Sequence, residues 1–398
     1  MLLGIFLIIL AVTLIGFRLF VVIFSIAYQY FIYPYLIRPR FDSSWLPRCS
    51  IIVPSKGLPK NGKKNWSSFL YMDYPDYEVI YVVEDKNDPG ANRIKSLIKN
   101  HKHAKLVVAG RAKTCAQKNH NILAGIAATN NAEVYVFADN DISPSTQWLR
   151  TLILPLSSDR IYVTSGYKWF QGKNGSISEH IHTFMNMHMY TFFIFSACFI
   201  NIGLWGGSMA IRSDKFDELM VSKLWSETVV DDMSLSKILK ASKKRIIFVP
   251  ECITHSNDLL QTLHQCQLWY TRQILFFKVY FRSLWRYTLF VIAAIIAFYL
   301  LLPIAVIGSI LTENAFYNWG GKAAALFFGG EYLAVLLSAL LGPNTRLGRF
   351  TLRIPFLLLF QNVIYMKTIG VDIIVWSDIL YNIDREGRVT KVEHLIPK

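Results

Sequence analysis

The sequence predicts an α/β domain with a Rossmann-like, mostly parallel sheet, set between transmembrane and interfacial helices. The 398 residues are 53% hydrophobic and 14% aromatic, which is more apolar than soluble domains usually are. The apolar excess sits at the two ends of the chain, whereas the middle alternates short β-branched runs with helical patterns. Strands that alternate with helices indicate βαβ units and therefore a parallel sheet.

Residues 1–37 are expected to form a transmembrane anchor. The run is apolar apart from Arg18 and continues into a tyrosine-rich stretch that suits a membrane interface. A cleaved signal peptide would carry its charge before a short apolar core and would end in small residues. Arg38, Arg40 and Arg48 follow directly, so the positive-inside rule places the next segment on the cytosolic side.

Residues 38–282 are expected to form one cytosolic domain, since this length is usual for a single fold. The predicted strands are the runs CSIIVPSKG, EVIYVVED, KLVVAG and AEVYVFADND, and helices are predicted around ANRIKSLIKNH and AQKNHNILAGIAA. In a sheet of this kind the ligand crevice lies at the carboxyl ends of the strands. Polar residues that directly follow these runs are therefore the candidates for a functional site.

Acidic residues follow two of the predicted strands. Asp139 and Asp141 come after VYVFA, and Asp85 comes after EVIYVV. Such residues are also common turn formers, which is the alternative interpretation. Carboxylates suit Mg²⁺ or Mn²⁺, so Asp139 and Asp141 are candidate metal ligands and Asp85 could hold a base or a ribose. Lys118, in the loop beyond, could approach a diphosphate or could simply be solvated.

A third acidic pair, Asp231 and Asp232, stands directly before a predicted helix. Acids at a helix start are favourable by a few tenths to ~1 kcal/mol, which explains the pair without any chemistry. The functional alternative is a general base that removes the proton of an acceptor hydroxyl. The residues alone leave both interpretations open.

Residues 283–398 are expected to form a C-terminal membrane region with a basic tail. Residues 287–311 and 323–341 are long and apolar enough to span ~30 Å of hydrocarbon, although the second run contains Glu331. Residues 354–376 carry several polar side chains and are predicted to be an interfacial or re-entrant helix, with a fourth membrane crossing as the alternative. The basic tail favours a cytosolic end.

The net charge of +15 favours an anionic membrane surface or a phosphorylated substrate as the partner. No recognised nucleic-acid-binding motif occurs, which argues against nucleic acid. The five cysteines are odd in number and scattered, so they indicate reduced thiols in the cytosol and no disulfide framework.

Taken together, these stretches resemble the inverting, GT-A fold, family 2-like glycosyltransferases, and most closely the ceramide glucosyltransferases. The resemblance runs from Ser55 to about Trp269 and includes the order of anchor and C-terminal spans. SKGLPKN and FLYMDYPDYEVIYVVEDKNDPG are similar to the family's opening block, and AQKNHN, FADND and VVDDMSL are similar to later ones. In these blocks the family's first acidic site falls on Asp85 and its donor-side lysine on Lys118. Its second acidic site falls on Asp139, where Asp141 completes a DxD motif, and its general base falls on Asp232 beside Asp231.

The chain departs from the family's Gln-x-x-Arg-Trp motif. Gln265 and Trp269 match it, but Leu268 stands where the family has arginine. Arg272, one helical turn further along, could supply the missing cation, because a guanidinium group suits phosphate. The resemblance therefore implies that Gln265, Trp269 and Arg272 bind the donor.

Two further residues gain an expected place from the resemblance. His188 is similar in position to a family histidine near the donor or acceptor, although a histidine on a membrane-surface helix is the alternative. Its segment, HTFMNMHMYTFFIFSACFI, could lie at the bilayer surface. Gly207 lies in a loop that resembles the one beneath the sugar, where glycine allows close backbone approach.

The resemblance implies a metal-dependent, inverting hexosyltransferase at the cytosolic face of a membrane. Its donor would be a UDP-sugar, with UDP-glucose first, and its acceptor a lipid hydroxyl such as that of ceramide. Mg²⁺ or Mn²⁺ would be bound by Asp141, with help from Asp139. Two alternatives remain: a processive polysaccharide synthase, and a non-enzymatic membrane scaffold with a degenerate transferase domain.

Overall fold

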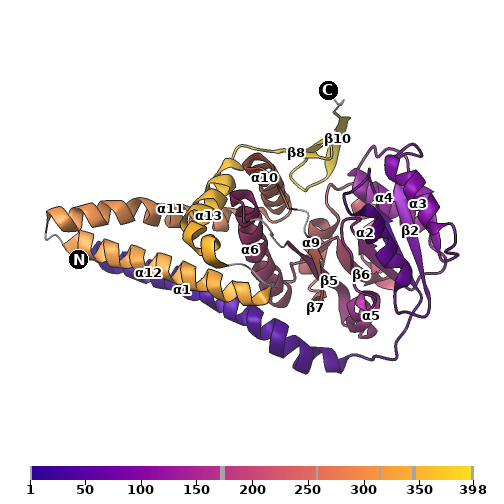
Figure 1. The fold of residues 1–398 in the computed structure, drawn as a ribbon, viewed down its shortest axis with the longest axis horizontal. Coiled ribbons are helices and arrows are strands. Elements are labelled where there is room, and N and C mark those ends of the chain that lie inside the picture. The colour runs from indigo at the N-terminus through magenta and orange to yellow at the C-terminus, as the bar shows by residue number, and fades with distance from the viewer. Residues whose placement is uncertain (1, 171–174, 257–258, 313–314, 343–346, 396–398) are drawn as a thin grey trace.

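The computed structural model describes residues 2–170, 175–256, 259–312, 315–342 and 347–395. An α/β domain forms one end of the molecule, and three long helices extend away from it side by side (Figure 1). These helices are α1 (Leu2–Ala27), α11 (Arg282–Leu311) and α12 (Ala315–Ser338). After α1 the chain continues as a π-helical segment, Tyr28–Ile37, and a 3₁₀ turn, Arg38–Arg40, before it enters the domain.

The domain is built on a seven-stranded sheet with the order β3-β2-β1-β4-β6-β5-β7. The strands are β1 (Cys49–Pro54), β2 (Tyr77–Val83), β3 (Ala104–Val108), β4 (Val134–Ala138), β5 (Ile161–Phe170), β6 (Ser208–Arg212) and β7 (Arg245–Ser256). β1 to β4 pair in parallel, as do β5 and β7, whereas β6 is antiparallel to both of its neighbours. The predicted mostly parallel α/β sheet is confirmed.

Helices cover both faces of this sheet, which is why the central strands are continuous apolar runs. They are α2 (Gly62–Ser68), α3 (Pro89–Ile98), α4 (Gln117–Ala127), α5 (Trp148–Ile153), α7 (Ser213–Glu218), α8 (Val221–Trp225) and α9 (Asp231–Ala241), with 3₁₀ turns at Phe69–Tyr71, Leu154–Ser157 and Ala339–Leu341. α3 and α4 match the two helices predicted from the sequence. Local chemistry sets where α3 begins: Asp88 accepts a hydrogen bond from the Gly90 amide, and Pro89 occupies the first helical position.

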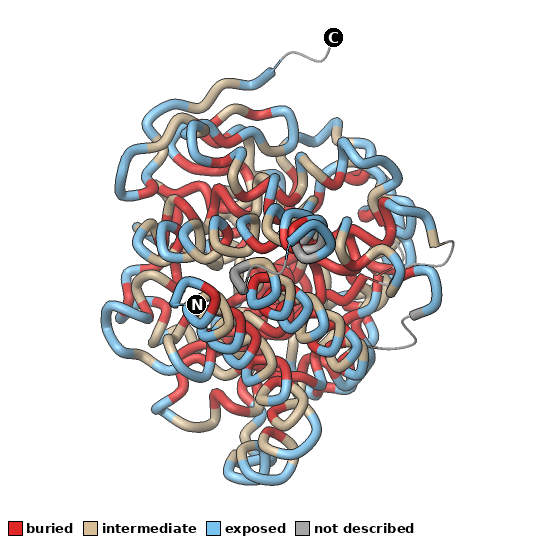
Figure 2. The backbone as a smooth tube through the Cα atoms, turned by 90° about the vertical axis from the view of Figure 1, so that its left-hand side faces the viewer, coloured by how far each residue is buried: buried red, intermediate tan, exposed pale blue. Residues whose placement is uncertain are grey.

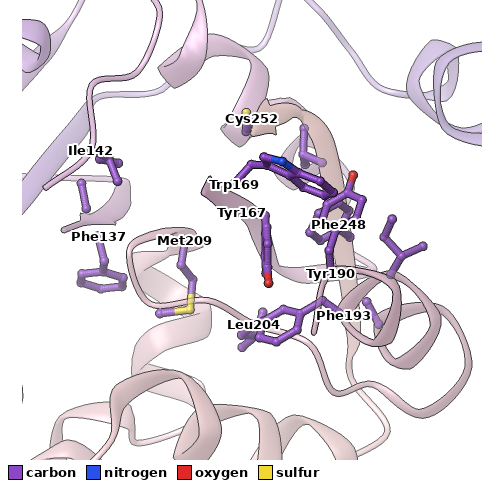
Figure 3. Packing of buried hydrophobic residues seen from close by; sticks show 14 of the residues in the cluster. Phe137, Ile142, Tyr167, Trp169, Tyr190, Phe193, Leu204, Met209, Phe248 and Cys252 are labelled. Atoms are coloured by element: carbon purple, nitrogen blue, oxygen red, sulfur yellow. The ribbon is translucent and has the colours of Figure 1, made fainter. Parts of the chain in front are cut away.

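The long helix α6 (Ile177–Ile200) packs against the sheet. Figure 3 shows Tyr167 and Trp169 of β5 beside Tyr190 and Phe193 of α6. The ring centroids of Tyr167 and Phe193 are 5.3 Å apart, and those of Trp169 and Tyr190 are 5.2 Å apart. Aromatic pairs at these distances stabilise beyond the area they bury, so α6 is held firmly against the domain.

Four helices in the described part of the chain are long and apolar enough to cross a membrane, which makes this a membrane protein. They cover 2–40, 177–200, 282–305 and 317–341. The three spans predicted from the sequence are among them, and α6 is the addition. Large apolar side chains such as Phe6, Phe17 and Phe20 point outward from α1, and seen end-on the outer sides of the protruding helices are exposed (Figure 2).

The C-terminal region differs from the prediction of one interfacial or re-entrant helix over 354–376 followed by a basic tail. Helix α13 (Leu347–Lys367) ends earlier, and the chain then forms a three-stranded antiparallel sheet, β8 (Ile373–Trp376), β9 (Ile379–Ile383) and β10 (Val389–His394). A bulge interrupts β10 between Val389 and Lys391.

The small sheet forms because alternate residues of its strands are apolar and can be buried together. Ile374, Ile379 and Tyr381 join a cluster with residues of α10 (Leu263–Tyr280). Lys278 of α10 fixes the entry to the sheet, because its ammonium donates to the carbonyls of Thr368, Ile369 and Val371 and to Asp372. This tail is therefore part of the folded domain.

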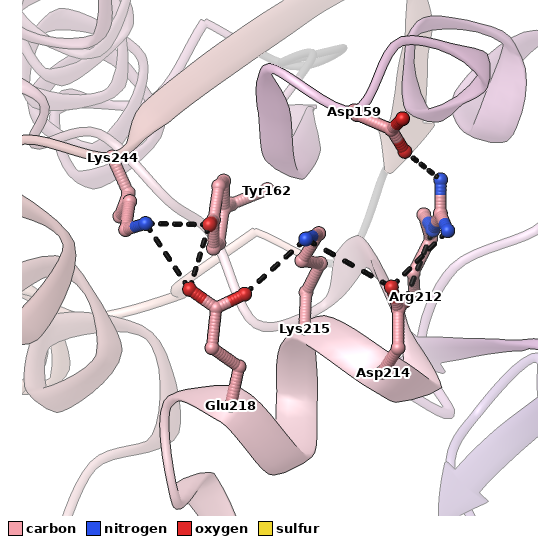
Figure 4. Close-up of polar contacts among 7 residues, drawn as sticks. All are labelled: Asp159, Tyr162, Arg212, Asp214, Lys215, Glu218 and Lys244. Carbon is pink, nitrogen blue, oxygen red and sulfur yellow. Dashed lines mark hydrogen bonds and ion pairs between the residues drawn. The ribbon is translucent and has the colours of Figure 1, made fainter.

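On the surface, an ionic cluster ties α7 to β5 and to the start of β7 (Figure 4). The Tyr162 hydroxyl donates to the Glu218 carboxylate over 2.8 Å and accepts from the Lys244 ammonium. The hydrogen bond from Tyr162 and that from Lys244 lower the pKa of Glu218 to about 2. Because the Lys244 and Glu218 side chains are partly exposed to solvent, the contribution of their ion pair to stability is small.

Candidate active site

A cavity of about 690 Å³ lies at the carboxyl ends of β1 and β4, between the sheet and helices α6, α10 and α13. One part of its wall is charged and comes from the α/β domain. That part comprises Lys118, Asp139, Asp141, Lys168, Asp231 and Asp232. Another part of the wall is rich in aromatic side chains and comes from α6, α10, α13 and the C-terminal sheet. A polar and an apolar half thus meet in one space.

Lys118 joins two of the predicted acidic sites. Its ammonium lies 2.9 Å from Asp139 Oδ1 and 3.1 Å from Asp231 Oδ2. Burial opposes the charge on this ammonium, but Asp139, Asp231 and Asp232 outweigh it and raise the pKa of Lys118. The lysine therefore stays charged at the N-terminal turn of α4, where a helix dipole also favours an anion.

The loop before β6 requires glycine at two positions. A Cβ on Gly206 would collide with the Asp231 carboxylate, and a Cβ on Gly207 would collide with Asp139 and with the Trp205 ring. The Gly207 carbonyl also accepts a hydrogen bond from the Asp139 amide, 3.1 Å away. The two glycines thus let the backbone lie directly against the acids.

Asp232 is held by backbone amides at the start of α9. Its Oδ2 accepts from the Gly206 amide over 2.9 Å, and its Oδ1 accepts from the Met233 amide over 2.6 Å. Burial and the neighbouring Asp231 carboxylate raise the pKa of Asp232 to about 7. A carboxylate with a pKa near the working pH is suited to act as a general base.

Asp141 is paired with Lys168, a residue that the sequence analysis missed. The Lys168 ammonium contacts Asp141 Oδ2 and lies 4.8 Å over the Phe170 ring. The other carboxylate oxygen, Asp141 Oδ1, is buried and has no hydrogen-bond partner. The only signal for Lys168 in the sequence was a lysine inside an otherwise uncharged buried strand, where lysine is rarely found unpaired.

These residues fit a divalent cation that takes most of its ligands from a substrate. Among the described residues, no group of three or more acidic, histidine or cysteine side chains could hold a metal alone. Mg²⁺ typically needs only one or two carboxylates when phosphates and water supply the remaining oxygens. The unpartnered Asp141 Oδ1 is such an oxygen, with Asp139 two residues away on the same loop.

The sequence profile of glycosyl transferase family 21 matches residues 17–389, which is nearly the whole chain. The chain belongs to glycosyl transferase family 21. Among solved structures, this family 21 glycosyltransferase is similar to the mannosyltransferase PcManGT from Pyrobaculum calidifontis, solved with GDP-Man and Mn²⁺. The identity is 14% over 89% of this chain and 99% of that chain, with a TM-score of 0.48. Glucosyl-3-phosphoglycerate synthase from Mycobacterium tuberculosis is 14% identical over 59% of this chain and 80% of that chain, with a TM-score of 0.39.

In the family 21 glycosyltransferase, several predicted donor or acceptor residues do line the cavity. Trp269 and Arg272 of α10 do so, and His188 of α6 does as well, with its Nδ1 3.0 Å from the Phe184 carbonyl oxygen. The Arg272 guanidinium lies 5.7 Å from the centroid of the Trp376 ring, and its Nε has no hydrogen-bond partner.

Two predicted donor residues lie elsewhere. The Gln265 side chain completes a capping box with Thr262 at the start of α10, and Asp85 is an exposed residue whose carboxylate accepts from the Asn87 amide. Neither is among the residues that line the cavity. Leu268, which replaces the motif arginine, is 56% exposed and also lies off the cavity wall. The positions of Gln265 and Asp85 therefore do not support their predicted roles in donor binding.

The tertiary structure also brings a segment to the cavity that no sequence motif indicated. Trp376, Ser377, Ile379 and Tyr381 of the β8–β9 hairpin form part of the wall. They follow the last long helix by several residues and carry no motif, so only the tertiary structure identifies them.

Proposed function

We propose that this family 21 glycosyltransferase transfers a sugar, with inversion, from a UDP-sugar to the hydroxyl group of a membrane lipid. The favoured pair is UDP-glucose and ceramide, which rests on the sequence resemblance. The observation that carries the reaction type is Asp232, whose pKa of about 7 and place on the cavity wall suit a general base. Asp231 beside it is tied to Lys118 and would orient that lysine.

The charged half of the cavity would hold the donor. Lys118 would bind the diphosphate, because the surrounding carboxylates keep its ammonium charged and it lies in the first turn of α4. A divalent cation held by Asp141 and Asp139 would neutralise charge on the leaving diphosphate. Lys168, next to Asp141, adds a second fixed positive charge on the same side.

The transfer would then be a single displacement. The acceptor hydroxyl oxygen attacks the anomeric carbon while the bond between that carbon and the diphosphate oxygen breaks. Asp232 takes the hydroxyl proton, and the bonding electrons leave with the UDP group. Because attack and departure take place on opposite faces of the sugar, an α-linked donor gives a β-linked product. Fixed charges at the leaving group supply much of the acceleration.

The apolar half of the cavity supports a lipid acceptor. Phe192, Phe193 and Phe277 line it together with Thr288 of α11 and Gln361 of α13. α6 and α11 are two of the four helices that are apolar enough to cross a membrane. A lipid whose chains lie among these helices could present its hydroxyl to Asp232 without leaving the bilayer surface.

The cytosolic orientation is also part of this proposal. Arg38, Arg40 and Arg48 lie between α1 and the first strand, which favours the cytosolic side for the domain. Arg38 pairs with Glu251 of β7 over 3.3 Å, so one of these charges also anchors the domain to its membrane helix.

A transfer assay in detergent or nanodiscs tests the function. UDP-glucose, UDP-galactose and UDP-N-acetylglucosamine are each offered with ceramide, diacylglycerol and a total lipid extract, in the presence of Mn²⁺. We expect a labelled glycolipid that EDTA abolishes and that the Asp232→Asn variant does not form. UDP-sugar binding without transfer to any lipid would contradict the acceptor class. The absence of both binding and transfer would favour the non-enzymatic scaffold.

A further inference from the structure

The C-terminal sheet is fastened to the catalytic domain at points far apart in the sequence. The Val389 amide donates to the Glu227 carbonyl over 2.7 Å, four residues before Asp231. The Tyr280 hydroxyl donates to the Gly387 carbonyl over 3.0 Å and accepts from the Val229 amide over 3.3 Å. In Figure 1, β8 and β10 lie beside α10, toward the side of the domain that carries α4. The small sheet is therefore linked by hydrogen bonds to residues 227–229, the segment that leads to the candidate base Asp232.

The β8–β9 hairpin also reaches the strand ends on the donor side. The Lys56 ammonium, just after β1, donates to the Ser377 carbonyl over 2.9 Å. The Tyr381 hydroxyl accepts from the backbone amide of Gln117, the first residue of α4, over 3.3 Å. Lys56 and Gln117 both line the cavity. The hairpin thus spans the crevice at the carboxyl ends of the strands, where open α/β sheets bind nucleotides.

One face of the hairpin is turned toward the cavity and the other is turned away. Trp376 lines the cavity, and its ring lies 5.9 Å from that of Phe276 and close to the Arg272 guanidinium. Ile373 and Val375, which alternate with it along β8, are 46% and 50% exposed. A flat aromatic surface beside a planar cation is a suitable platform for a nucleobase.

The turn that presents this face has an uncommon backbone. Ser377 and Asp378 both have positive φ angles, 52° and 63°, in the left-handed region that few residues other than glycine adopt. Two such residues in a row make the tight hairpin turn whose twist matches the flanking strands. The contact from Lys56 to the Ser377 carbonyl holds this turn over the end of β1.

We propose that the β8–β9 hairpin is the roof of the donor subsite, and that Trp376 stacks on the base of the bound nucleoside diphosphate. This inference rests on the proposed function, because it requires a nucleotide donor in the charged half of the cavity. Tyr381 is a positioning residue, since it holds the hairpin against the first turn of α4.

The test is UDP binding to the full-length protein in nanodiscs, measured by titration calorimetry with Mn²⁺ present. Trp376→Ala is expected to weaken UDP binding by about fivefold or more, the lower end of what base–aromatic stacking contributes. Trp376→Phe keeps an aromatic face and is expected to retain most of the affinity. Val375→Ala is the matched control, because it removes a side chain from the opposite face of the same strand.

Hydrogen exchange provides a second measurement that does not depend on the substitutions. UDP is expected to slow amide exchange in residues 373–383 of the wild-type protein, as a roof in contact with ligand requires. Thermal melts of all variants check that the hairpin still folds.

The outcomes separate the two proposals. If the wild-type protein binds no UDP or other nucleoside diphosphate, the proposed function fails and this inference fails with it. If the wild type binds UDP but Trp376→Ala binds it equally well, the roof is refuted while the donor assignment stands. A variant that changes only the KM for the lipid would also refute the roof, because the hairpin would then contact the acceptor.

Discussion

Replacing Asp232 with asparagine tests the chemistry and the electrostatics of the site together. The amide has nearly the same shape and can still accept one of the two backbone hydrogen bonds from Gly206 and Met233. It cannot take up a proton from an acceptor. General-base catalysis contributes about 10²–10⁴-fold, so kcat should fall by at least about 100-fold while UDP binding is retained.

The pH dependence follows from the raised pKa of Asp232, which is about 7 in the folded protein against an ordinary value of 3.8. Only the ionised form can act as the base, so kcat/KM of the wild type should fall about tenfold per pH unit below pH 7. A pH–rate profile from pH 5 to pH 9 measures this. A flat profile between pH 5.5 and pH 7, or near-normal turnover by Asp232→Asn, would refute the assignment.

The same pKa makes a prediction about stability. A carboxyl group whose pKa is raised on folding contributes stability that is fully present below the unfolded pKa and is lost as pH rises toward the folded one. For Asp232 this loss falls in the window between its ordinary pKa of 3.8 and its folded pKa of about 7. The melting temperature of Asp232→Asn should therefore rise relative to that of the wild type as pH rises through this window. Asp217→Asn, an exposed carboxylate outside the cavity, is the control and should show no such gain.

Three further predictions concern single substitutions in and near the site. Gly206→Ala forces a Cβ into the Asp231 carboxylate and should lower the unfolding free energy by about 1–3 kcal/mol in thermal melts, whereas Gly16→Ala, with open space at its Cβ, should not. Lys168→Gln leaves the Asp141 carboxylate without its cation and should lower kcat/KM by about tenfold or more; unchanged kinetics would show that Lys168 only stabilises the fold. Leu268→Arg restores the family motif at an exposed position, so the donor KM should stay within about twofold, and a large improvement would contradict this placement.

The sequence predicted those parts of the structure whose chemistry is local. Acids that directly follow β-branched runs lie at strand ends in a parallel sheet, so the place of Asp139 and Asp141 after β4 could be predicted from the sequence. Asp232 could be singled out because it lies in the first turn of a predicted helix, within a block that resembles a known family. Long apolar runs such as 287–311 indicate spans by length alone.

The remaining features depend on contacts between distant residues. Lys168 is 27 residues from its partner Asp141, and a lysine in a strand carries no sign of what it faces. The C-terminal strands are only four to six residues long. The turn between β8 and β9 contains serine and aspartate, whereas a glycine there would have indicated a turn in the sequence. The motif predicts that Gln265 binds the donor, but its side chain forms the capping box of α10. The spacing of residues in a motif cannot distinguish these two roles.

The bulge in β10 bears on how the protein behaves at high concentration. β10 is an outer strand of its sheet, and such strands expose backbone amides and carbonyls that could pair with a second molecule. The bulge between Val389 and Lys391 interrupts that row, and the Lys391–Glu393 ion pair places charge along it. β3, at the border of the large sheet, has only five residues and carries Lys105, which pairs with Glu78. Strand-to-strand aggregation through β10 and through β3 is thus disfavoured.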